Sequence, residues 1–140
     1  MSDKYFIDTN IFVYSFSPSD MRRRKRAESI IENALKSRRG CISFQVIQEF
    51  VNVATRKFPI PLSIPDCGRY LKDVLSPLCE VFSSVELYEQ ALDLMERWRF
   101  SYYDSLIVAS ALRADCDILY SEDFQDSQKI FELTVRDPFK

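Results

Sequence analysis

Four acidic side chains are the residues of this sequence best suited to chemistry: Asp8, Glu49, Asp104 and Asp123. The 140-residue chain contains no histidine, and this excludes a Ser-His-Asp triad, a Cys-His pair and an HExxH zinc site. If the chain is an enzyme, carboxylates are therefore its natural reagents. Oxygen ligands without nitrogen or sulfur favour Mg²⁺, Mn²⁺ or Ca²⁺ over zinc.

The predicted secondary structure brings these acids toward one rim. Asp8 directly follows a predicted strand, Lys4–Ile7, and Asp123 follows a second one, Ile118–Tyr120. Ser101 begins a capping signal for a nearly all-apolar helix that runs to Ala114, and Asp104 falls three residues after it. Such a helix should be central and buried. Ligands of α/β folds collect at the carboxyl ends of strands, so we expect the acids to lie together there.

Clustered carboxylates repel one another. At about 4 Å a pair of like charges costs on the order of 4 kcal/mol at an intermediate effective dielectric, so the cluster is tolerable mainly with a cation bound. A divalent cation lowers the pKa of water and neutralises charge on a phosphorane-like transition state. The pattern therefore predicts phosphodiester hydrolysis without histidine.

Each acid also has an ordinary structural explanation. Asp8 is a favoured residue type for a helix N-cap, and Glu49 could lie on the solvated face of a helix. The segment Ser101–Asp104 can be read as a capping box, and Glu122-Asp123 as an acidic turn.

Alternating strands and helices predict an α/β domain with a mainly parallel sheet covered on both faces. The length fits one domain, residues 1–140. The remaining predicted elements are a helix ending at Arg39-Gly40, a strand Cys41–Ser43, a helix Phe44–Phe58, a helix Ile64–Leu75 that Pro77 separates from a strand Cys79–Phe82, a helix Val85–Trp98 and a last strand Phe131–Val135.

The net charge of −2 gives no bulk attraction to nucleic acid or membranes, so any RNA binding must come from local patches. The basic run Arg22, Arg23, Arg24, Lys25 and Arg26 is a candidate phosphate-binding patch or a solvated face. Arg97 and Arg99, among aromatic residues, could help to stack bases, although these rings could equally be core.

Four cysteines lie far apart without a CxxC pair, so we expect reduced, mostly buried thiols. No apolar segment approaches the roughly 20 residues that span a bilayer. We expect a cytoplasmic protein that does not contact membranes.

Four motifs together resemble the PIN-domain family, particularly its VapC-like toxins. They are Phe6–Asn10, Gln48–Phe50, Tyr103–Ala109 and Leu119–Phe124, and the match runs from residue 4 to a terminal Asp137–Phe139. The resemblance implies a three-layer α/β/α sandwich, dependence on Mg²⁺ or Mn²⁺, and cleavage of tRNA or other single-stranded RNA. It also implies a homodimer and inhibition by a small VapB-like antitoxin.

The motifs also assign roles by position. Asp8, Glu49 and Asp104 match the family's core acids and Asp123 its fourth, with Glu122 as a residue that could replace or join Asp123. Thr9 and Ser121 match hydroxyl positions near the metal, and Asn10 matches a polar position that orients water. Ser127 stands where similar sequences often have glycine.

Other functions make different demands on the same sequence. A haloacid-dehalogenase-type phosphatase needs a second Asp two residues after the first, where Asn10 stands. A receiver domain needs an acceptor Asp after a middle strand, but Ser83-Ser84 follows Cys79–Phe82. From another class, the chain could be a non-catalytic RNA-binding or scaffold module with the same fold, and Mn²⁺ binding would discriminate it from a nuclease.

Overall fold

A six-stranded sheet forms the centre of the structure, a computed structural model that describes residues 3–140. The strands are β1 (Tyr5–Ile7), β2 (Gly40–Ser43), β3 (Cys79–Val81), β4 (Ile118–Tyr120), β5 (Lys129–Ile130) and β6 (Leu133–Arg136). Their order is β3-β2-β1-β4-β6-β5, and every neighbouring pair is parallel except β5 and β6. The sheet is therefore mainly parallel, as predicted.

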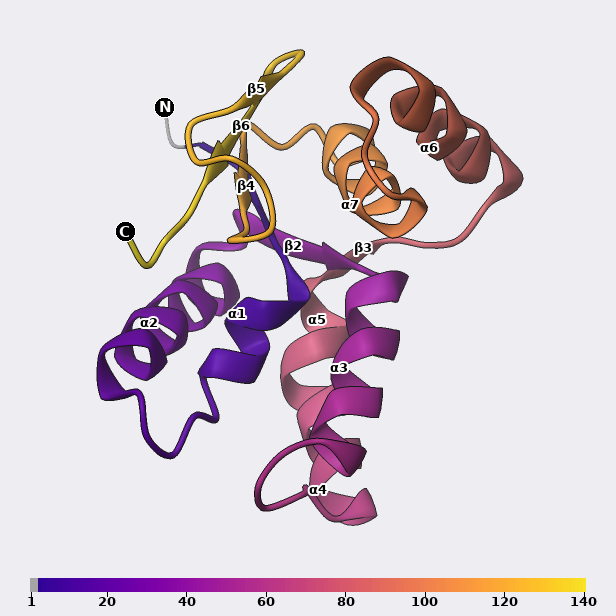
Figure 1. The fold of residues 1–140 in the computed structure, drawn as a ribbon. Helices are drawn as coiled ribbons and strands as arrows, with labels where there is room; N and C mark the ends of the chain where they lie inside the picture. The colour runs from indigo at the N-terminus through magenta and orange to yellow at the C-terminus, as the bar shows by residue number, and fades with distance from the viewer. Residues whose placement is uncertain (1–2) are drawn as a thin grey trace.

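Helices flank this sheet, with α1 and α2 on one side and α6 and α7 on the other (Figure 1). The fold is the predicted α/β/α arrangement. The helical segments are α1 (Thr9–Tyr14), α2 (Met21–Ser37), α3 (Phe44–Arg56), α4 (Ile64–Tyr70), a π-helical turn η1 (Leu71–Leu75), α5 (Ser76–Leu78), α6 (Val85–Trp98) and α7 (Tyr102–Arg113).

The strand order reverses direction at β1. From β1 the chain builds outward through β2 and β3 on one side, and through β4 and β6 on the other. The carboxyl ends of β1 and β4 therefore flank a topological switch point, the place where open α/β sheets generally bind their ligands. Asp8 follows β1 directly, and Ser121 follows β4.

The central strands and α7 are rich in apolar residues because they form the core. Every residue of β1 and β2 is buried, as expected for strands covered on both faces. In α7 the whole run from Ser105 to Ala111 is buried, which confirms the predicted central helix. Gly40 lets β2 approach α2, because a Cβ there would lie 2.4 Å from the Ala34 Cβ and 2.6 Å from the Tyr5 ring.

Two predicted boundaries were wrong. The segment predicted as one strand, Phe131–Val135, contains the turn of a β5–β6 hairpin, and Phe131 in that turn has a left-handed φ of 56°. The predicted helix Ile64–Leu75 does not stop before Pro77 but continues to Leu78. Pro77 lies in α5, directly after the π-helical turn η1.

No helix within residues 3–140 is both long enough and apolar enough to cross a membrane.

Candidate functional site

Asp8 is a buried carboxylate at the centre of the rim. It is 5% exposed and caps α1, with its Oδ1 accepting a hydrogen bond from the Thr9 backbone N–H at 2.7 Å. Its Oδ2 accepts from the Ser121 hydroxyl at 2.7 Å. Burial raises the pKa of Asp8 to about 7, the two hydrogen bonds oppose this, and the charges of Asp123 and Glu49 add to it. Asp8 therefore both caps α1 and belongs to the acidic cluster.

Glu49 reaches the same rim from α3. Its Oε1 accepts a 2.5 Å hydrogen bond from the Thr9 hydroxyl, and its Oε2 accepts from Gln45 Nε2 at 3.3 Å. The same Gln45 nitrogen also donates to the Tyr103 carbonyl of α7 at 3.2 Å. These contacts join α1, α3 and α7 around one carboxylate, which is partly buried rather than on a fully solvated face.

Asp104 stands in the first turn of α7. Its backbone N–H donates to the hydroxyl of the N-cap residue Ser101 at 3.2 Å, so the capping contact uses the backbone and leaves the carboxylate free of that role. The carboxylate is partly buried, and its charge is one cause of the raised pKa of Asp123.

Asp123 and Glu122, which follow β4, have different surroundings. The pKa of Asp123 is raised by partial desolvation and then by Asp104, Glu122 and Glu49, although the residue as a whole is exposed. Glu122 instead accepts a 2.8 Å hydrogen bond from the Tyr14 hydroxyl. Asp123 is therefore the acid of this pair whose pKa is raised by the other acids of the cluster.

The structure brings together the four predicted acids. The charges of Asp123 and Glu49 help to raise the pKa of Asp8, and the charges of Asp104 and Glu49 help to raise the pKa of Asp123. The predicted hydroxyl residues also lie here, because Thr9 donates to Glu49 and Ser121 donates to Asp8. Asn10, in the first turn of α1, is partly exposed.

The donor set fits a hard divalent cation, because every candidate ligand is a carboxylate or hydroxyl oxygen. Within residues 3–140, however, no three acidic or cysteine side chains are arranged to hold one ion directly. Mg²⁺ usually binds through one or two carboxylates and keeps several waters or substrate phosphates as its other ligands. The arrangement suits such an ion better than a protein cage of four carboxylates.

The basic run at the start of α2 is largely engaged within the chain. Arg22 and Arg26 donate to the backbone carbonyls of Phe139 and Pro138 at 2.9 and 3.2 Å. Arg23 pairs with Asp20 at 3.0 Å, and its guanidinium lies 5.3 Å from the centre of the Tyr14 ring. These side chains hold the C-terminal segment against α2, a role that the sequence analysis did not anticipate.

Sequence reasoning missed two residues that shape the site. Gln45 is 3% exposed and contacts Glu49, and its Oε1 has no hydrogen-bond partner among the described residues. Its position four residues before Glu49 was the available signal, because such residues share a helix face. For Tyr14, which binds Glu122 from 108 positions away, the sequence held no local signal.

The cysteines are free, and three of the four are buried, as predicted. The Sγ atoms of Cys41 and Cys116 lie 3.4 Å apart, a pairing that the spacing of the sequence does not indicate.

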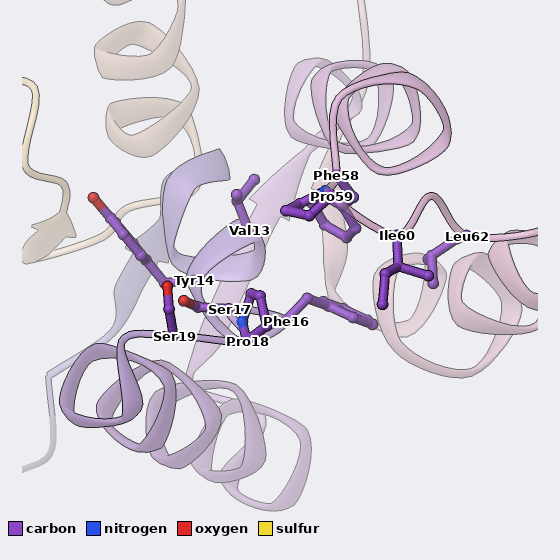
Figure 2. Close-up of a pocket in the computed structure, with 10 residues that line it drawn as sticks. All are labelled: Val13, Tyr14, Phe16, Ser17, Pro18, Ser19, Phe58, Pro59, Ile60 and Leu62. Carbon is purple, nitrogen blue, oxygen red and sulfur yellow. The ribbon is translucent and has the colours of Figure 1, made fainter.

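A separate apolar pocket of about 340 Å³ lies between the end of α1, the loop Ser17–Ser19 and the segment Phe58–Leu62 (Figure 2). Phe16, Phe58 and Ile60 help to line it, and none of the four acids does. It offers apolar contact without a charged side chain, so we place the candidate chemistry at the acidic rim.

Comparisons with known proteins agree with this fold. A family model described as the PIN domain matches residues 5–128. No curated protein matches the sequence significantly.

Several solved structures superpose on the chain. A toxin–antitoxin complex from Klebsiella pneumoniae aligns with 94% of this chain and 96% of that one, with a TM-score of 0.69 and 19% identity. The VapC20 toxin of Mycobacterium tuberculosis, described as cleaving the sarcin–ricin loop, covers 86% and 90%, with a TM-score of 0.61 and 18% identity. The FitAB complex bound to an IR36 DNA fragment covers 97% and 96%, with a TM-score of 0.68 and 14% identity. At these identities the likeness is one of fold.

Proposed function

The chain belongs to the PIN domain family, and we propose that it is an endoribonuclease that depends on Mg²⁺ or Mn²⁺ and hydrolyses phosphodiester bonds of RNA. The observation that carries the proposal is the convergence of Asp8, Glu49, Asp104 and Asp123 at the switch point of the sheet. The charges of Asp123 and Glu49 help to raise the pKa of Asp8, and those of Asp104 and Glu49 help to raise the pKa of Asp123. We further propose that residues 1–140 act as a single domain.

In this proposal Thr9 and Ser121 hold the acids in place. Each donates a hydrogen bond to one carboxylate oxygen, and a carboxylate has about four lone-pair sites, so capacity remains for a further ligand. A divalent cation bound there would lower the pKa of a water molecule and offset charge on the phosphorus centre. Asn10, at the start of α1, is the residue that we assign to orienting that water.

We assign the fourth acidic position to Asp123 rather than Glu122. The Glu122 carboxylate is engaged by the Tyr14 hydroxyl, whereas Asp123 responds to the charges of Asp104 and Glu49. Protons compete with a cation for these carboxylates, so apparent metal affinity should rise with pH and level off above the pKa of Asp8, about 7.

We propose tRNA or another single-stranded RNA as the substrate and a small VapB-like antitoxin as a partner, in the cytoplasm and with the chain as a homodimer. The partner proposal is supported by the structural neighbours, which include the Klebsiella complex and a VapBC2 complex from Rickettsia felis. The RNA proposal is supported by the VapC20 toxin, which is described as cleaving the sarcin–ricin loop.

The basic run Arg22–Arg26 remains our proposal for a phosphate contact, with Lys25 as its most informative member. Lys25 is exposed, whereas Arg22 and Arg26 bind the C-terminal carbonyls. Lys25→Gln should weaken RNA binding and reduce the salt slope by about one charge contact. An unchanged salt dependence of RNA binding would mean that Lys25 is a solvated surface residue that does not contact phosphate.

The decisive test of the nuclease is cleavage of a mixed pool of tRNA and single-stranded RNA, with Mn²⁺ or with EDTA, by the intact chain and by Asp104→Asn. The variant should keep its fold, because the contact with Ser101 uses the backbone N–H, and it should lose cleavage. Asp93→Asn, an exposed acid on α6, is the matched control and should cut normally.

Calorimetric titration with Mn²⁺ separates the nuclease from a non-catalytic RNA-binding or scaffold module. Cleavage only with metal and Asp104 intact supports the nuclease. Absence of both cleavage and Mn²⁺ binding in a folded sample would favour the scaffold module.

A further inference from the structure

A continuous line of aromatic rings runs from the acidic rim to the β5–β6 hairpin. Phe124, next to Asp123, packs edge-on against Phe100, with ring centroids 5.2 Å apart. Phe100 lies parallel to Trp98 at 6.1 Å, and Trp98 meets Phe131 at 6.3 Å. The rings come from α6, from the segment after it, and from two separate loops, so tertiary folding assembles this line.

The far end of the line is open. Phe131 is 54% exposed, whereas Trp98, Phe100 and Phe124 are partly buried. Arg97, Trp98 and Phe131 line an open groove of about 300 Å³. Such an exposed ring gains little from the core, so burial within this chain does not account for it.

The backbone at Phe131 is in the left-handed region, with a φ of 56°. This conformation is uncommon for a bulky residue and favours glycine at a hairpin turn. Backbone strain of this kind clusters at functional sites. A phenyl ring thus stands where a glycine would suit the turn better.

Cationic charge accompanies the rings. The Arg97 guanidinium lies 5.5 Å from the centre of the Phe131 ring. Within residues 3–140 no carboxylate forms an ion pair with Arg97 or with the neighbouring Arg99. An unpaired guanidinium over an exposed ring offers a phosphate contact beside a stacking surface.

We propose that Arg97, Trp98 and Phe131 form a stacking platform for unpaired bases of single-stranded RNA, with Phe100 and Phe124 leading the strand toward Asp123. Aromatic faces stack every base, and cationic side chains bind the backbone, so the platform takes single strands with little sequence preference. A duplex, whose bases are already stacked, does not fit it. The proposal deepens the proposed ribonuclease function and rests on it for the identity of the ligand.

Trp98 is the only tryptophan of the chain, so its intrinsic fluorescence reports on the platform directly. We would titrate the intact chain, in EDTA to remove divalent ions, with a seven-residue oligouridylate and with an RNA duplex. Trp98 emission should be quenched by the single strand and not by the duplex. Anisotropy of the same oligonucleotide carrying a 5′ fluorescein gives the affinity independently.

Phe131→Gly is the test variant, because it removes the ring and suits the positive φ, so the turn is kept. It should weaken oligouridylate binding about fivefold or more, as expected for loss of one stacking partner. Phe131→Tyr retains a ring and should bind normally. Phe82→Ala, which removes another exposed phenyl ring, is the matched control and should also leave affinity unchanged.

The outcomes separate this proposal from the nuclease itself. Quenching without RNA cleavage under any metal condition would refute the nuclease and leave the platform standing. Cleavage with no quenching, or with Phe131→Gly binding as tightly as the intact chain, would overturn the platform. A change in oligomeric state of Phe131→Gly at unchanged RNA affinity would instead assign the ring to a protein interface.

Discussion

Replacing the Asp8 carboxylate by an amide should stabilise the metal-free protein at neutral and alkaline pH. The folded pKa of this buried acid is raised from 3.8 to about 7. At about 1.4 kcal/mol per pKa unit the shift corresponds to roughly 4 kcal/mol. Because water entry relaxes such penalties, we expect Asp8→Asn to gain roughly 2–4 kcal/mol at pH 8.

The hydrogen bonds at this position should survive the substitution. The Asn oxygen can still accept from the Thr9 N–H, and its amide can donate to the Ser121 oxygen. The substitution therefore removes mainly the desolvated charge and its repulsion from Asp123 and Glu49.

The pH window follows from the sign of the shift. Between about pH 4 and pH 7 the folded protein keeps a proton on Asp8 that the unfolded chain releases, so stability falls as pH rises through this range. The loss is complete above about pH 8. Asparagine does not titrate, so the advantage of Asp8→Asn should be largest at pH 8 and should vanish near pH 4.

Urea unfolding in EDTA between pH 4 and pH 8.5 measures this directly. In thermal scans the gain should appear as roughly 6–15 °C in Tm. Asp20→Asn is the control: Asp20 is a partly buried N-cap whose pKa is lowered by its hydrogen bond from the Arg23 backbone N–H, so that variant should gain nothing. Mn²⁺ should stabilise the intact chain more than it stabilises the Asp8→Asn variant. Added Mn²⁺ should therefore narrow the difference in free energy of unfolding between the two proteins.

A gain that does not vary with pH, or a loss of stability at pH 8, would refute this account of the site. Either result would mean that the Asp8 carboxylate is hydrated or paired in solution, and that the clustered acids do not repel one another as their positions require.

Two further predictions concern the backbone. Ser127→Gly should stabilise the fold by about 0.5–1 kcal/mol. Ser127 has a φ of 67°, and the relief of left-handed strain outweighs the larger conformational entropy that glycine loses on folding. A lower urea midpoint for the variant would contradict this. Gly40→Ala should destabilise by about 1–3 kcal/mol, since its Cβ would overlap Ala34 and Tyr5. The urea midpoint should fall at an unchanged m-value, and an unchanged midpoint would mean that α2 moves away from β2 freely.

Local sequence patterns predicted most elements, because a helix or strand is specified by residues within a few positions of one another. The apolar run after Ser101 predicted α7, and the strand Lys4–Ile7 ahead of Asp8, a favoured N-cap residue, predicted β1 and the N-cap of the helix that follows it. The β5–β6 hairpin was missed because Phe131 occupies a turn position where glycine or asparagine is the usual signal.

The acids themselves were identified from residue type and position at strand ends, and their assignment as metal ligands stays a prediction. The family resemblance assigned Asp123 as the fourth acid, but the sequence left open whether Glu122 replaces or joins it. The hydrogen bond from Tyr14 to Glu122 distinguishes them, and that contact exists only once α1 and the loop after β4 have packed together.

The sequence by itself thus determined the α/β class, the positions of β1 to β4 and the acidic character of the candidate site, since these follow from local periodicity and from residue type. Only the tertiary structure decided the strand order that places Asp8 beside Ser121, the burial of Gln45 and the contacts of Arg22 and Arg26 with the C-terminal segment. These features join residues far apart in the chain. They depend on how complete elements pack, and no short window of sequence specifies such packing.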